Sequence, residues 1–232
     1  MVRMPPRTRT ATPTRADLVL ADIRADILNG RLAPGSRLGF AGLGERYDVS
    51  TGVLREVLPR LVEQGLATSE SQLGFRVIDV SVDRLQRLTE ARVALDTLVT
   101  REAIAHGDLA WEAGVVATHH TLARSGGENE AHDISEDWIL AHEAFHVAIL
   151  GGCPNEYLVD AAVRLRSISL VYRVWSAPAA ERAHRDVEQE HREIMESVVA
   201  RDSDRAAELT VAHIRRSTDL LISGRPADAP VA

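Results

Sequence analysis

Apolar residues recur at helical spacing near the start of the chain, where Leu20, Ile23 and Ile27 share one face. The pattern begins after Thr14, whose hydroxyl can cap a helix start, and it stops at Gly30, a residue that favours helix termination. The spacing therefore predicts one short amphipathic helix between these two residues.

Two further short helices are predicted next. A Pro34-Gly35 turn precedes apolar positions spread over residues 38–47, and a denser apolar stripe runs from Ser50 to a stop at Gly65. Two short helices joined by a tight turn form the arrangement that places one helix in the major groove of DNA.

A hairpin completes this first region. Residues 66–70 and 75–80 are extended pieces on either side of a turn at residues 71–74. We therefore expect a winged helix-turn-helix over residues 15–80, preceded by a disordered basic arm at residues 1–14.

From Ser81 onward the pattern is helical and strand signals are absent. A stripe on the first helix is formed by Leu85, Leu88, Leu95 and Leu98. The pattern breaks at Gly107, Gly126-Gly127, Gly151-Gly152, Pro178 and near Asp202. The chain is therefore expected to be mainly α, with an antiparallel bundle of about six helices over residues 81–222 and a flexible tail at 223–232. The last two helices are expected over residues 180–200 and 203–221.

Charge is distributed unevenly. The chain has 232 residues, 27 arginines, no lysine and a net charge of −7; residues 1–80 hold 11 arginines and 9 acids, residues 81–232 hold 16 and 25. Because an acidic body is repelled by phosphate, DNA contact is expected in the first region. The arginines at positions 3, 7, 9 and 15 either add to that contact or only keep the arm soluble.

Composition also bounds the compartment. Cys153 is the single cysteine, so an internal disulfide is excluded, and the N-terminus lacks the apolar core of a signal peptide. No apolar run approaches the length of a membrane span. We expect a cytoplasmic protein.

The first region resembles the GntR family of bacterial transcriptional regulators. The matching elements are Ile27-Leu-Asn-Gly30, Pro34-Gly-Ser-Arg-Leu38, Val49-Ser50, Leu54-Arg-Glu-Val-Leu58, Leu61, Glu63-Gln-Gly-Leu66 and Gly74-Phe-Arg-Val77. The resemblance implies a homodimer on a palindromic operator in double-stranded DNA. The candidate DNA-binding residues are Arg37, Ser50, Thr51, Gly52, Arg55, Gly74 and Arg76.

Arg55 is the principal candidate, because it lies one turn beyond the N-terminus of the third helix and a guanidinium can fork guanine O6 and N7. The alternative is an ion pair with an acid such as Glu56 of the partner subunit. Relatives usually carry Ser-Arg-Thr-Pro where this chain has Ser50-Thr51-Gly52-Val53, and basic residues where it has Ser71-Gln72-Leu73. Weaker binding or a different operator is expected.

Histidines are confined to the second region. His142 and His146 are four residues apart and therefore share a helix face, while His191 and His213 come from two later helices. Imidazoles converging from three helices could hold Zn, Ni, Fe or Cu. The other histidines lack partners at ligand spacing; they are His106, His119, His120, His132 and His184.

This second region resembles the FCD ligand-binding domain of the FadR branch of GntR regulators. The resemblance is carried by Phe145-His146, Asn155-Glu-Tyr-Leu158, Glu190-His191 with Ile194, Arg201-Asp202 and His213. It implies a divalent metal, with Arg92 and Asn155 as candidate effector-binding residues and Arg92 forking a carboxylate. The alternative for Arg92 is an ion pair with Glu90 or Asp96.

His142 stands where the family usually has an aspartate. A neutral ligand leaves the full charge on the cation, which favours an anionic effector and selects zinc or nickel over harder cations. The alternative is a pocket that has lost its metal.

The leading hypothesis is a repressor switched by a small carboxylate effector. A metal-dependent hydrolase is disfavoured because Glu143, one residue round the helix from His142, is expected to face elsewhere. A metal-free regulator of a larger apolar or acyl effector is the other alternative. The chain is not expected to be an enzyme.

Overall fold

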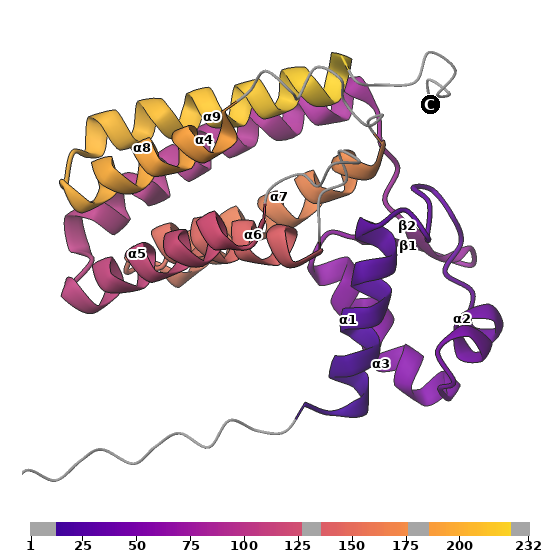
Figure 1. The fold of residues 1–232 in the computed structure, drawn as a ribbon. Helices are drawn as coiled ribbons and strands as arrows, with labels where there is room; N and C mark the ends of the chain where they lie inside the picture. The colour runs from indigo at the N-terminus through magenta and orange to yellow at the C-terminus, as the bar shows by residue number, and fades with distance from the viewer. Residues whose placement is uncertain (1–12, 127–135, 176–185, 224–232) are drawn as a thin grey trace, which may run out of the picture. The chain divides into compact units, whose positions relative to one another are not determined.

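The computed structural model describes residues 13–126, 136–175 and 186–223. The chain forms two compact units, residues 1–78 and residues 79–232, which are described separately (Figure 1). The predicted mainly α fold, with a winged helix-turn-helix and a helical bundle, is confirmed.

The first unit contains helices α1 (Arg15–Leu28), α2 (Phe40–Arg46) and α3 (Thr51–Glu63), followed by strands β1 (Ala67–Glu70) and β2 (Gly74–Val77). The strands pair antiparallel, with Thr68 opposite Arg76. The segment before α2 adds to this wing, because Arg37 bridges to Arg76 on the other side. Gly74 adopts a φ of 85°, a conformation that favours glycine at the end of the wing turn.

Local signals explain these elements. Thr14 and Asp17 form a reciprocal capping box at the start of α1. The core between α1 and α3 is fully buried and consists of Ile23, Ile27, Leu54, Leu58 and Leu61. The buried Asp26 lies at the end of α1, where Arg31, Arg46 and Tyr47 contact its carboxylate.

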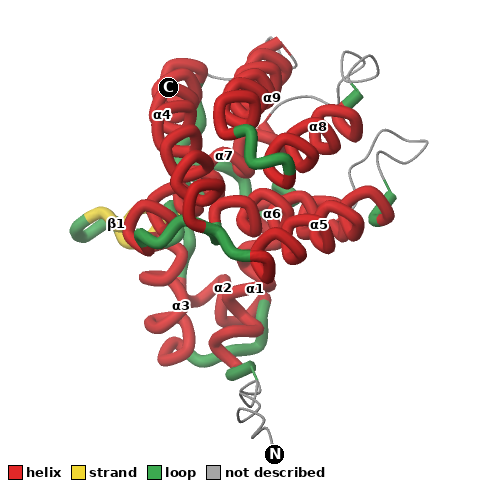
Figure 2. Tube along the Cα trace, turned by 90° about the vertical axis from the view of Figure 1, so that its left-hand side faces the viewer, coloured by secondary structure: helices red, strands yellow, loops and turns green. Residues whose placement is uncertain are grey.

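The second unit contains α4 (Val82–His106), α5 (Leu109–Arg124), α6 (Glu136–Leu150), α7 (Glu156–Trp175), α8 (Val187–Val199) and α9 (Ser203–Ser223). The long α4 packs against α9 and α7, α5 against α6 and α8, and α8 against α9 (Figure 1). Within the described ranges the only strands are those of the wing in the first unit (Figure 2).

Trp111 fixes one end of this bundle. Its indole N–H donates to the carbonyls of Ala148 (2.8 Å) and Ile149 (3.2 Å). A Cβ at Gly107 or Gly152 would lie 2.2 or 2.7 Å from the Trp111 ring, so both helix ends approach too closely for a larger residue.

Two expectations about the bundle need correction. Leu98 is 45% exposed, because the buried face of α4 instead passes through Asp96, Val99 and Ala103. The helix expected over residues 180–200 begins at Val187 among the described residues, where Asp186 caps it; Pro178 lies outside them. No helix in the described ranges is long and apolar enough to cross a bilayer.

Candidate functional site

The structure brings four histidines together inside the second unit. His142 and His146 come from α6, His191 from α8 and His213 from α9, and all four are buried. One ligand nitrogen from each lies within 4.8 Å of all the others. The cluster forms because i and i+4 residues share a face of α6 and because α8 and α9 are packed neighbours.

The geometry of the cluster suits a small cation. The Nε2 atoms of His146 and His191 are 3.3 Å apart, close to the separation of about 3.3 Å between two nitrogens of a tetrahedral zinc site. Burial, the charge of Arg166 and the three other histidines hold the pKa of His146 well below its usual range. His146 is therefore neutral at neutral pH, as metal ligation requires.

Carboxylates lie behind two of these imidazoles. His213 Nδ1 is 2.9 Å from Glu190 Oε2, which leaves its Nε2 for a cation when Nδ1 carries the proton. His142 Nδ1 is 3.6 Å from Glu143 Oε1. The expectation that Glu143 faces away from His142 is therefore wrong. Arg166 of α7 lies beside the Glu143 carboxylate, with Nη2 3.4 Å from Oε1. The donor set thus fits a divalent cation, with four neutral ligands and outer carboxylates.

Arg92 lies in a buried ionic cluster on α4. Its Nη2 donates to Asp96 Oδ2 at 3.2 Å and its Nη1 donates to Ser169 Oγ at 3.1 Å. Burial and the charge of Arg166 lower the pKa of the Arg92 guanidinium. Arg92 therefore makes the Asp96 ion pair and lies beside a second guanidinium.

Sequence reasoning missed Arg166. Its side chain is 5% exposed and it lies between Asp96 and Glu143. A signal existed, since Arg166 is four residues from both Ala162 and Leu170, which are buried on the same face of α7.

Asn155 has a different place from the one expected. Its Oδ1 accepts from the backbone N–H groups of Tyr157 and Leu158 at 3.2 and 3.3 Å, so it caps α7 and is exposed. About 16 Å of helix separates it from Arg166. Asn155 therefore caps α7, and its effector contact stays a prediction.

The candidate DNA-binding residues of the first unit lie at its surface. Ser50 is the N-cap of α3, and its hydroxyl makes no capping hydrogen bond there. Thr51, Gly52 and Arg55 are exposed on the first turns of α3, whereas Leu54 and Leu58 face the core. This face of α3 is available to a ligand.

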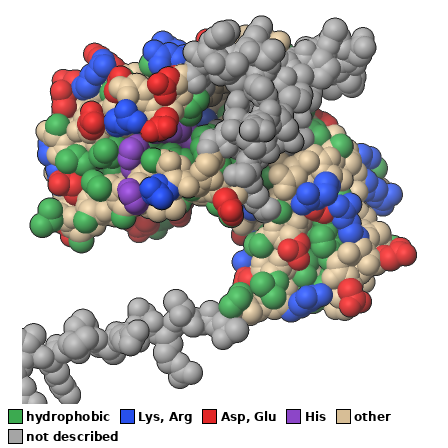
Figure 3. All heavy atoms as spheres, in the orientation of Figure 1, with side chains coloured by type: hydrophobic (Ala, Val, Ile, Leu, Met, Phe, Trp, Pro, Cys, Tyr) green, Lys and Arg blue, Asp and Glu red, His purple; other side chains and the backbone are tan. Residues whose placement is uncertain are grey.

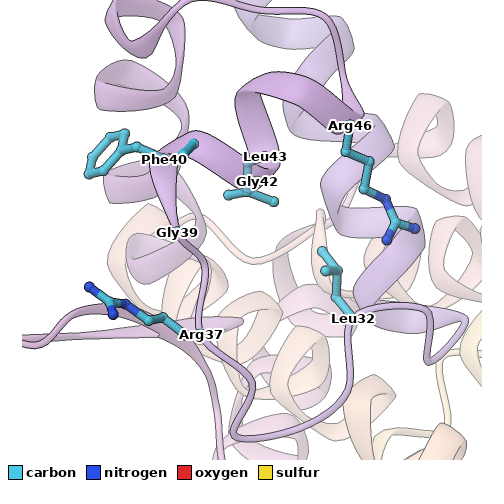
Figure 4. Close-up of a pocket in the computed structure, with 8 residues that line it drawn as sticks. Leu32, Arg37, Gly39, Phe40, Gly42, Leu43 and Arg46 are labelled. Carbon is cyan, nitrogen blue, oxygen red and sulfur yellow. The ribbon is translucent and has the colours of Figure 1, made fainter.

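Arg37 and Arg76 are neighbours on the wing through their backbone bridge. Arg76 Nη1 donates to Gly35 O at 3.0 Å, which holds part of its guanidinium against the wing. An open groove beside α2 is lined by Leu32, Arg37, Gly39, Phe40, Ala41, Gly42, Leu43 and Arg46. Figure 4 shows Arg37 and Arg46 on opposite sides of it.

Charge on the second unit is mixed. On the face shown in Figure 3, acidic and basic side chains are interspersed over its helices. Arginines of the second unit also form ion pairs with acids, as in the pairs of Arg87 with Asp83 and Arg192 with Glu188. The described residues on this face therefore offer no continuous basic track for a phosphate backbone.

Each of the two units matches a known protein family. Residues 15–77 match the family described as bacterial regulatory proteins, gntR family, and residues 87–216 match the FCD domain. The chain is 35% identical over 206 residues to the uncharacterised HTH-type transcriptional regulator BphR of Paraburkholderia xenovorans, covering 86% of this chain and 82% of that protein. It is 34% identical over 199 residues to the HTH-type transcriptional repressor GlaR of Escherichia coli, covering 83% and 89%.

Solved structures show the same fold. The structure of E. coli McbR/YncC superposes with a TM-score of 0.73 at 19% identity, covering 91% of this chain and 99% of that chain. A GntR regulator from Rhodococcus gives a TM-score of 0.70 at 19% identity, covering 91% and 99%. The relatives identified by sequence are transcriptional regulators, not enzymes.

Proposed function

Because the chain belongs to the GntR family of bacterial DNA-binding transcriptional regulators and carries an FCD domain, we propose that it is a repressor switched by a small carboxylate effector. Residues 15–80 bind a palindromic operator as a homodimer, and residues 81–222 hold the effector beside a zinc or nickel ion. Its 34% identity to a transcriptional repressor supports the direction of control.

The observation that carries the proposal is the buried cluster of His142, His146, His191 and His213. When bound, a divalent cation supplies a positive charge that attracts an effector carboxylate. Glu190 orients the His213 ring, and Glu143 lies against His142. With four neutral ligands the ion keeps its full charge, which favours an anion over an apolar effector.

In the first unit, the residues proposed to contact the operator are Arg37, Ser50, Thr51, Gly52, Arg55, Gly74 and Arg76. Arg55 is exposed one turn along α3, where a guanidinium can fork a guanine edge. One recognition helix covers only half of a palindromic site, so two subunits are needed. Light scattering should therefore give twice the chain mass of 25.4 kDa.

Elemental analysis and DNA binding of the purified protein test the proposal together. We expect near one zinc or nickel per chain, and anisotropy of a labelled palindromic operator should show release when a carboxylate effector is added. His191→Ala should lose the metal, whereas His120→Ala, an exposed histidine of α5, should keep it. Metal affinity should fall in acid, because only neutral imidazole ligates, and His146 should stay neutral to a pH below the usual histidine range of about 6.5 because its pKa is lowered.

His142→Asp sharpens the metal assignment. The carboxylate should keep the ion but admit manganese more readily, and it should weaken anion binding by cancelling one positive charge. Wild-type protein that takes up neither zinc nor nickel at neutral pH would instead favour the metal-free regulator with an apolar effector.

A further inference from the structure

Two buried arginines share one carboxylate oxygen in the second unit. Asp96 Oδ2 is 3.2 Å from Arg92 Nη2 and 3.6 Å from Arg166 Nη1. The side chains of Arg92, Arg166 and Asp96 are 11%, 5% and 2% exposed. Two cations thus converge on a single anionic atom inside the protein.

This cluster leaves hydrogen-bonding capacity unused. Within the described part of the chain, Arg92 Nε, Arg166 Nε and Asp96 Oδ1 are buried and have no hydrogen-bond partner. The ionic contacts are also longer than the roughly 2.7–2.9 Å of a charge-assisted hydrogen bond. Because unpaired buried donors on charged groups are costly, the two guanidiniums can accept a further anion.

The arginine pair adjoins the histidine cluster. Arg166 Nη2 is 3.4 Å from Glu143 Oε1, and the same oxygen is 3.6 Å from His142 Nδ1. A ligand held by Arg166 therefore lies beside the ion that the proposed function places on the histidines.

We propose that Arg92 and Arg166 together form the binding site for the effector carboxylate, and that Asp96 is an internal carboxylate that occupies this site when no effector is bound. The inference rests on the proposed effector pocket and adds Arg166 and Asp96 to it. An incoming carboxylate takes over the guanidinium donors, and Asp96 loses its hold on Arg166.

The exchange acts on a particular helix contact. Arg92 and Asp96 lie on α4, the first helix after the wing in the chain, whereas Arg166 lies on α7, which packs against α4. Without effector, Asp96 ties the two helices directly. With effector, the tie runs through the ligand, so its strength depends on which anion is present.

The test uses the zinc-loaded full-length protein with sodium acetate as the probe and sodium chloride at equal ionic strength as the reference. Calorimetry measures acetate affinity, thermal unfolding measures stability, and elemental analysis measures zinc. Arg166→Gln should weaken acetate binding roughly 10- to 100-fold, the range for losing a hydrogen bond to a charged group, with zinc retained. Arg164→Gln, an exposed arginine of the same helix, is the matched control and should change neither.

Asp96→Asn should act in the opposite direction. With the internal competitor removed, acetate should bind about tenfold more tightly than in wild type. Acetate should also raise the melting temperature of this variant more than that of wild type. Should a single variant fail to fold, the double variant Asp96→Asn/Arg166→Gln restores the charge balance and should bind acetate weakly.

Acetate affinity that is unchanged by Arg166→Gln, or not raised by Asp96→Asn, would overturn the inference. Wild-type tightness in the double variant would do the same. If wild type takes up no zinc, the metal part of the proposed function fails, yet the acetate comparison can still be made, since neither arginine is a metal ligand.

Discussion

Among the described residues, each unit of the molecule buries one aspartate against arginines, and the two sites differ in how well the carboxylate is satisfied. Asp26 is 7% exposed and Asp96 is 1% exposed. Asp26 uses both oxygens: Arg31 contacts Oδ1, while Arg46 and Tyr47 contact Oδ2 at 2.5 and 2.7 Å. Asp96 uses one oxygen at 3.2 and 3.6 Å.

Burial of the cations explains what the difference means. The side chains of Arg31 and Arg46 are 54% and 41% exposed, so their remaining donors reach water. Arg92 and Arg166 are almost fully buried, so their remaining donors meet only protein or a ligand. Aspartate buried against arginines is thus a fully hydrogen-bonded structural contact at Asp26, whereas at Asp96 it leaves donors that a ligand can use.

The largest effect is expected at the Asp26 site. Asp26→Ala should lower the free energy of unfolding by about 2–4 kcal/mol, because a buried carboxylate with several donors is lost. Hydrogen exchange of the α1 amides measures this locally, with Asp22→Ala, an exposed acid of the same helix, as the control. Acetate should not restore the loss; recovery with acetate would mean that the two sites are alike.

Arg55→Ala should affect DNA binding by the first unit and leave ligand binding by the second unit unchanged. Operator affinity should fall by about 1–3 kcal/mol, the worth of a bidentate base contact, while zinc content and acetate binding stay unchanged. Anisotropy titrations at several salt concentrations measure the change, with Arg124→Ala, an exposed arginine of α5, as the control. Full sequence discrimination in the mutant would remove Arg55 as a reader of the operator.

A smaller effect is expected at the hydroxyl that supports Asp26. Tyr47→Phe removes one of the donors and should cost about 0.5–1.5 kcal/mol of unfolding free energy, since both arginines stay in place. Urea unfolding measures the change. A loss as large as that of Asp26→Ala would show that the arginine contacts contribute little.

The smallest effect is a pH dependence. Burial acts to raise the pKa of Asp26, but hydrogen bonds from Tyr47 and Arg31 and the charge of Arg46 hold that pKa below its usual value. The stabilisation is therefore fully present above the usual carboxyl pKa of about 4 and is lost as the pH falls through the lower folded-state pKa. Below about pH 4, the free energy of unfolding should fall less steeply with decreasing pH in Asp26→Asn than in wild type. Equal slopes would show that other carboxylates cause the acid destabilisation.

Most of the fold follows from local signals in the sequence. Capping residues such as Thr14 and the stops at Gly30 and Gly65 act within a few positions, and they place the first-unit helices closely. The grouping of the four histidines also follows, because i and i+4 spacing and packed neighbouring helices suffice for it.

What the sequence did not reveal depends on contacts between distant segments. Arg166 approaches Asp96 and Glu143 only because α7, α4 and α6 pack together. The rotation of α4 about its axis, which exposes Leu98 and buries Asp96, is set by the packing of α9, α7 and α6 against it. The capping of α7 by the side chain of Asn155 was also not evident from the sequence.

The indole of Trp138 lies stacked on His142, with ring centroids 4.7 Å apart and planes inclined by 22°. Binding of a cation changes the electron density of the imidazole ring that is stacked on the indole. The fluorescence of Trp138 should therefore change when the ion binds. Nickel or copper should quench the emission, whereas zinc, with its filled d shell, should leave it bright. The fold thereby contains an optical reporter of its own occupancy, which allows binding to be followed in unlabelled protein.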